Sequence, residues 1–65
     1  MDHANDNYVI LRKVGRHYSP TITATGRSEA IASVVLLEAT EPGDYLLLNL
    51  RTRITETSEE AKSAA

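Results

Sequence analysis

The sequence predicts an α+β domain in which one helix packs on one face of a three-stranded antiparallel sheet. Three observations indicate this fold class. Two stretches rich in β-branched and aromatic residues flank a glycine turn, an apolar pattern with helical spacing follows them, and a third apolar stretch begins after Pro42 and Gly43. The expected element order is therefore β-β-α-β, and the 65 residues make a single small domain.

The first two strands are expected at residues 8–14 and 18–25, joined by a loop at residues 15–17. Gly15 suits this loop because glycine readily takes a positive φ. Pro20 has no N–H for a strand ladder, so the second strand should lie at an edge of the sheet. Residues 1–7 are polar and aperiodic, which is typical of a flexible N-terminal lead.

The helix is expected within residues 26–40, where apolar residues recur at intervals of three and four. Thr25 is the predicted N-cap, and Pro42 with Gly43 ends the helix. The members of the apolar stripe are Ala30, Ile31, Val34, Val35 and Leu37.

A right-handed crossover through this helix places the third strand beside the first, which gives the strand order 2-1-3. The domain should therefore occupy residues 8–54. Residues 55–65 are acidic and lack a large apolar side chain, so we expect a solvated C-terminal tail. Thr57 and Glu60 have the spacing of a capping box, which would support one helical turn at most.

The third strand lies in "GDYLLLNLRTRI" and presents two alternating faces. The more apolar face, which we expect against the helix, is Leu46, Leu48, Leu50, Thr52 and Ile54. The face expected to remain bare is Tyr45, Leu47, Asn49, Arg51 and Arg53. Strand one is apolar on both sides, so the pattern leaves open which of its sides faces the helix.

A bare, partly apolar sheet face indicates an interaction surface. A chain this small without cysteine gains buried surface best by oligomerisation, so we expect a homodimer formed through the sheet face or an exposed edge. A separate protein partner is the alternative occupant, because aromatic residues and arginine dominate binding hot spots. The expected partner-binding residues are Tyr45, Leu47, Arg51, Arg53 and Arg12.

A competing interpretation is single-stranded nucleic-acid or nucleotide binding, with a tyrosine as the stacking platform. The net charge of −2 and the absence of Phe and Trp argue against it. A weaker anion site is expected where the second strand meets the helix N-terminus, at Gly26, Arg27 and Ser28. A single glycine falls far short of a phosphate-binding fingerprint.

No residue pattern predicts catalysis. His3 and His17 stand apart from other ligand-type residues, and no serine lies in a nucleophile-elbow pattern. We therefore expect a non-enzymatic protein without a metal or cofactor. No basic-then-apolar leader and no apolar run approaching 20 residues is present, so the expectation is a cytoplasmic protein without a membrane segment.

The compact β-β-α-β body with polar ends resembles, in size and general character, the small accessory proteins that bacteriophages encode. Many of those proteins bind and block a host factor. The resemblance implies an inhibitor of a host enzyme or defence complex that acts by steric occlusion.

Overall fold

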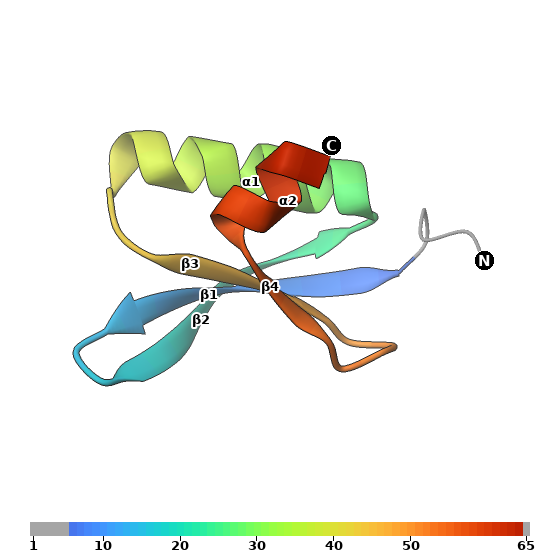
Figure 1. The fold of residues 1–65 in the computed structure, drawn as a ribbon, viewed down its shortest axis with the longest axis horizontal. Helices are drawn as coiled ribbons and strands as arrows, with labels where there is room; N and C mark the ends of the chain where they lie inside the picture. The colour runs from blue at the N-terminus through green and yellow to red at the C-terminus, as the bar shows by residue number, and fades with distance from the viewer. Residues whose placement is uncertain (1–5, 65) are drawn as a thin grey trace.

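The computed structural model describes residues 6–64, which form an α+β domain with both helices on one side of an antiparallel sheet (Figure 1). The fold class is confirmed, and the predicted order 2-1-3 is part of a four-stranded sheet with the order β2-β1-β3-β4. The prediction of three strands and one helix was wrong, because the chain adds a strand and a helix at its end. The elements are β1 (Asn7–Val14), β2 (His17–Thr25), α1 (Arg27–Thr40), β3 (Tyr45–Asn49), β4 (Thr55–Thr57) and α2 (Ser58–Ala64). Most of the N-terminal lead expected at residues 1–7 lies outside the described residues.

The hairpin of β1 and β2 closes through Gly15 and Arg16, and Gly15 has a φ of 65°. β2 lies at the edge of the sheet, as Pro20 indicated. The pairing shifts by one residue after Ile10, which leaves Thr21 as an extra residue whose hydroxyl donates to the Ile10 carbonyl at 2.9 Å. Such a bulge strengthens the local twist and bends the hairpin.

The N-cap of α1 is Gly26 rather than Thr25. Gly26 has a φ of 89° and its N–H donates to the Asp6 carbonyl at 2.7 Å, so the chain turns sharply from β2 into the helix. The Thr25 hydroxyl instead donates to Asn7 Oδ1 at 3.3 Å. The predicted cap was wrong because the neighbouring strand holds that threonine.

The predicted assignment of the faces of β3 was also wrong. Tyr45 and Leu47 are 2% and 0% exposed and lie beneath the helices, whereas Leu46 and Leu48 lie on the opposite, uncovered face. The strand ends at Asn49, so the turn that follows it contributes nothing to a strand face. On the neighbouring strand β1, the side chains that lie in the core are Tyr8 and Ile10. Its remaining members are Ala24, Ala30, Val34 and Ala61.

The segment expected as a solvated tail instead completes the fold. β4 pairs with β3 along Leu46 to Leu48, and α2 packs against α1. Ala61 is 0% exposed, so a small side chain docks this helix where we expected a large one to be necessary. The capping box indicated by the sequence is present, because Glu60 N–H donates to Thr57 Oγ1 at 3.1 Å and Thr57 N–H donates to Glu60 Oε1 at 2.9 Å.

Candidate functional site

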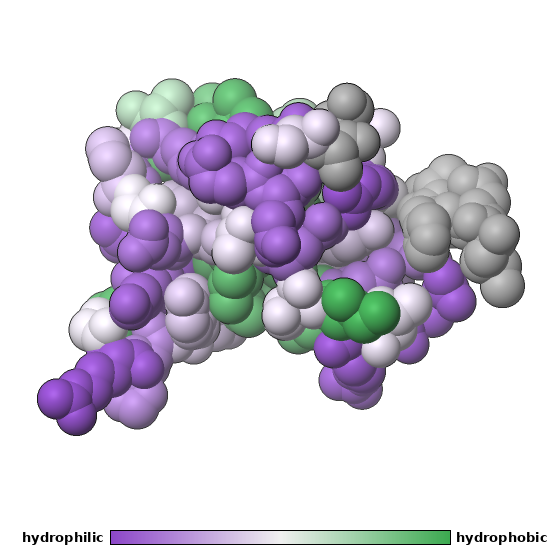
Figure 2. Space-filling model, viewed as in Figure 1, coloured by the Kyte–Doolittle hydropathy of each residue, from purple (hydrophilic) through white to green (hydrophobic). Residues whose placement is uncertain are grey.

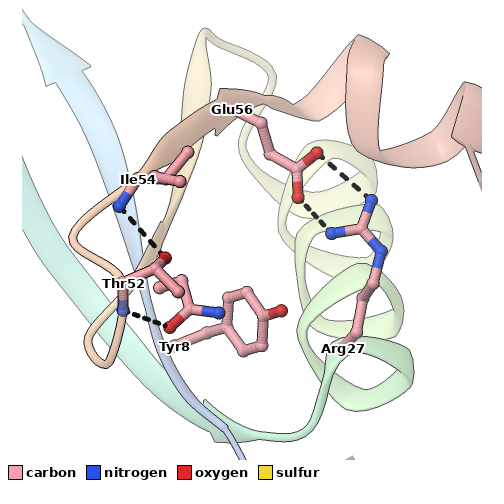
Figure 3. Close-up of a pocket in the computed structure, with 6 residues that line it drawn as sticks. Tyr8, Arg27, Thr52, Ile54 and Glu56 are labelled. Carbon is pink, nitrogen blue, oxygen red and sulfur yellow. Dashed lines mark hydrogen bonds and ion pairs between the residues drawn. The ribbon is translucent and has the colours of Figure 1, made fainter. Parts of the chain in front are cut away.

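A pocket of about 290 Å³ lies on the helix side of the sheet, between the start of α1 and the turn that joins β3 to β4 (Figure 3). Four of its six lining side chains are polar or charged, so it is more polar than the mostly apolar pockets that usually bind small ligands. The lining residues are Tyr8, Arg27, Asn49, Thr52, Ile54 and Glu56.

The charged groups of this pocket bind each other. The Arg27 guanidinium makes two hydrogen bonds to Glu56, one of them from Nη2 to Oε2 at 3.1 Å (Figure 3). These bonds raise the pKa of Arg27 above its ordinary value. The paired side chains connect the start of α1 to β4, so the bidentate pair has a structural role in fixing β4 against the helix.

A second polar cluster shapes the turn at the pocket rim. Asn49 Oδ1 accepts hydrogen bonds from the backbone N–H groups of Arg51 at 2.9 Å and Thr52 at 3.1 Å. Its amide donates to Asp6 Oδ2 at 2.9 Å, and Asp6 also accepts from Arg51 Nε at 2.8 Å. The bonds to Asp6 raise the pKa of Arg51 above its ordinary value. A buried asparagine and aspartate thus order the turn of residues 50–54.

The core does not use the face of the sheet opposite the helices. Register pairs Val9 with Leu48 and Leu11 with Leu46, and residues that pair across strands lie on the same face. We call the surface formed by Val9, Leu11, Leu46 and Leu48 the open face. All four side chains are half-buried, and no part of residues 6–64 forms a layer over them (Figure 1).

Exposed cations border the open face at both ends. Lys13 lies on β1 and Arg16 lies in the hairpin turn, while Arg53 lies in the turn between β3 and β4. Hydrophilic atoms project from the hairpin of β1 and β2 at the lower left of Figure 2. Within residues 6–64 the ion pairs involve none of these three cations. Asp44, whose carbonyl accepts from the Lys13 N–H at 2.9 Å, is also exposed at the Lys13 end, so this side of the sheet has an apolar centre and more cations than carboxylates at its ends.

The predicted partner-binding residues do not come together on one surface. Tyr45 and Leu47 are buried, and the Tyr45 hydroxyl donates to the Glu41 carbonyl at 2.6 Å. Arg12 lies on the same helix-covered side and donates to Glu41 Oε1 at 3.2 Å. The bonds from Tyr45 and Arg12 to Glu41 hold the segment after α1 against the sheet. Arg51 and Arg53 remain exposed in the turn that follows β3.

The predicted anion-binding residues lie where the sequence placed them, at the start of α1. Gly26 is buried, Ser28 is exposed, and the Arg27 charge is paired with Glu56. An anion would have to compete with that carboxylate for the guanidinium. The prediction of an anion site gains no additional support from this geometry.

None of the residues of the open face was among the predicted partner-binding residues, although the sequence pattern of strand one indicated such a face. Strand one is apolar at both alternating sets of positions, which is the pattern of a strand covered on both sides. Val9 and Leu11 belong to the set that faces away from the helices. Within residues 6–64, no group of three or more potential metal ligands is found, and no helix is long and apolar enough to cross a membrane.

Comparisons with protein-family models, with curated proteins and with solved structures found no match.

Proposed function

We propose that this chain is a small, homodimeric, non-enzymatic interaction protein that binds a macromolecular partner through the open face of its sheet. The observation that carries the proposal is the apolar cluster of Val9, Leu11, Leu46 and Leu48 with no layer over it. Contiguous apolar surface on a small soluble domain usually marks an interaction site.

The exposed cations favour a protein partner of particular chemistry. Lys13 with Arg16 lies at one end of the open face and Arg53 at the other, so two copies stacked face to face would bring cations together. A partner with an apolar patch bordered by carboxylates matches both features. By covering that patch, the protein would act as an inhibitor by steric occlusion, as the sequence resemblance implied for a host enzyme or defence complex.

Site-specific crosslinking tests this assignment. A photoreactive p-benzoylphenylalanine replaces Leu48 on the open face, and Ser28 at the exposed start of α1 is the matched control position. We expect crosslinks to another protein from position 48 only, weakened when Lys13→Glu and Arg53→Glu are added. Crosslinks between two copies at position 48 would instead identify the open face as a self-interface, and no crosslink from position 48 would contradict the proposal.

Single-stranded nucleic acid is the competing partner. Tyr8 and Tyr45 are buried, which leaves Tyr18, 42% exposed, as the accessible tyrosine in the described chain. Fluorescence anisotropy with a labelled single-stranded oligonucleotide separates the two classes of partner. Tight binding with a steep salt dependence, lost in Lys13→Glu, would favour nucleic acid, and weak binding at physiological salt would contradict a nucleic-acid partner.

A further inference from the structure

The C-terminal end of the described chain is attached to the domain differently from the other elements. β4 and α2 together span residues 55–64, and we call this segment the strap and the rest of the domain the body (Figure 1). Among residues 55–63 the buried side chains are Ser58 and Ala61, so one methyl group is the apolar side chain that the strap buries. The body fully buries Ile10, Val34 and Leu47. Because hydrophobic stabilisation scales with buried apolar area, it holds the strap far less firmly than the body.

Charged and polar contacts supply most of the attachment. Glu56 accepts two hydrogen bonds from Arg27 at the start of α1. Lys62 Nζ and the Ser58 hydroxyl donate to Glu38 near the end of α1, at 2.7 Å and 2.9 Å. The side chains of both ion pairs are partly exposed, between 22% and 35%. Ion pairs that water reaches contribute little to stability, so these contacts hold the strap only weakly.

The backbone of the strap is also easily released. β4 is an edge strand that pairs with β3 at three positions, opposite Leu46, Leu47 and Leu48. In the turn before it, Arg53 has a φ of 64°, a left-handed conformation that is unfavourable for a residue with a side chain. Release of β4 lets this backbone relax, which offsets part of the contact energy that is lost.

We infer that the strap detaches from the body as a unit while β1, β2, α1 and β3 stay folded. Terminal elements with few buried contacts open at a lower free energy than the whole domain. The capping box of Thr57 and Glu60 lies within the strap, so it does not fix α2 to the body. A helix as short as α2 is marginal in water, and it should therefore unwind once it leaves α1.

Detachment uncovers a strand edge beside the open face. The backbone groups of β3 that now pair with β4 would become available to another strand, next to Leu46 and Leu48. The strap thus covers an edge of the sheet that is closed in this structure. Its relevance to binding rests on the proposed function, since a partner on the open face would reach this edge only after the strap had left.

Amide hydrogen exchange of the full chain between zero and about 2 M urea tests the detachment. The hydrogen-bonded amides of the strap should open roughly 10-fold or more often than those of β1. Their exchange should change little with urea because a local opening exposes little surface, whereas exchange in β1 should accelerate steeply. Parallel acceleration of the strap and β1 would overturn the inference. A missing crosslink from position 48 would instead contradict the proposed function and leave the strap unaffected.

A variant of Glu38 tests whether the charged contacts hold the strap. Glu38→Gln removes the charge that faces Lys62, so exchange in the strap without urea should rise roughly 3-fold. Glu29→Gln is the matched control, because it removes an exposed carboxylate from the same helix, and it should leave the strap unchanged. Equal exchange in the strap of the two variants would overturn the inference.

Discussion

Arg51 Nε lies 2.8 Å from Asp6 Oδ1, although the two residues are 45 positions apart in the chain. The Asp6 side chain is 6% exposed, and its second oxygen accepts hydrogen bonds from Asn49 Nδ2 at 2.9 Å and from Arg51 Nη2 at 3.2 Å. One carboxylate therefore ties the entry of β1 to the turn between β3 and β4.

Asp6→Ala should destabilise the fold. The change leaves the Asn49 amide without its acceptor and removes two hydrogen bonds from Arg51. Because these bonds involve charged groups, we expect the free energy of unfolding to fall by about 1.5–3 kcal/mol in urea titrations. The exposed Asp44→Ala is the control and should change it by less than about 0.5 kcal/mol. Equal effects of the two changes would contradict this role for Asp6.

Adjacent leucines of β3 should respond differently to truncation. Leu47 is 0% exposed beneath the helices, so Leu47→Ala should cost about 2–5 kcal/mol of unfolding free energy. Leu46 lies half-buried on the open face, so Leu46→Ala should cost clearly less. Chemical denaturation of the two variants measures the difference. A larger loss at Leu46 would mean that the opposite face of β3 packs on the helices.

Stability should fall on acidification partly through Glu38. Lys62 Nζ donates a hydrogen bond to the Glu38 carboxylate at 2.7 Å, and the Ser58 hydroxyl donates another at 2.9 Å. These hydrogen bonds lower the pKa of Glu38 below its ordinary 4.5. A carboxylate with a lowered pKa in the folded state stabilises the fold above its unfolded pKa, and this contribution is lost as the pH falls through the folded pKa.

Urea titrations from about pH 6 to about pH 3 would measure this contribution in the wild type and in Glu38→Gln. We expect the two chains to differ most at the upper end and to converge as the carboxylate is protonated. Glu29→Gln controls for the loss of an exposed carboxylate. A constant difference between wild type and Glu38→Gln across the range would contradict the linkage.

Thr57→Ala should loosen α2. The substitution removes the hydroxyl that accepts from Glu60 N–H, and loss of such a cap costs about 1 kcal/mol. Because α2 has few turns, we expect faster amide hydrogen exchange in residues 58–64 with little change in β1. Thr55→Ala in the same strand is the matched control. Unchanged exchange in α2 would show that the docking of Ala61, rather than the cap, holds this helix.

The two glycines with positive φ should differ in their tolerance. Gly26 has a φ of 89° and a ψ of 152°, a conformation that essentially only glycine adopts, so Gly26→Ala should cost about 1–3 kcal/mol. Gly15 has a φ of 65°, where asparagine is accepted, and a Cβ added there would meet no atom within 4 Å beyond its chain neighbours. Thermal unfolding should therefore show a much smaller loss for Gly15→Asn. Equal losses would contradict the distinction.

Local chemistry allowed much of the fold to be predicted. The β-branched runs, the helical period after Gly26 and the missing N–H of Pro20 specified the order of elements and the edge position of β2. The Thr57 and Glu60 spacing specified a capping box that the structure contains. Each of these signals acts within a few residues, so neighbouring sequence suffices to read it.

The C-terminal elements were predicted poorly because their stability comes from distant partners. Glu56 pairs with Arg27 and Lys62 pairs with Glu38, and neither pair is visible in local composition. Ala61 has too small a side chain to signal burial from sequence alone, although it is fully enclosed.

The sequence by itself determined the α+β class, the order of β2, β1 and β3, and the presence of more apolar surface than one helix covers. Only the tertiary structure decided which side of the sheet the helices cover. β1 and β3 are apolar on both sides, so alternation gives nearly equal energies for the two choices. The balance is set by contacts on the covered side, where the Tyr45 hydroxyl donates to the Glu41 carbonyl and the Asn49 amide donates to the distant Asp6 carboxylate. Those contacts leave Leu46 and Leu48 on the open face.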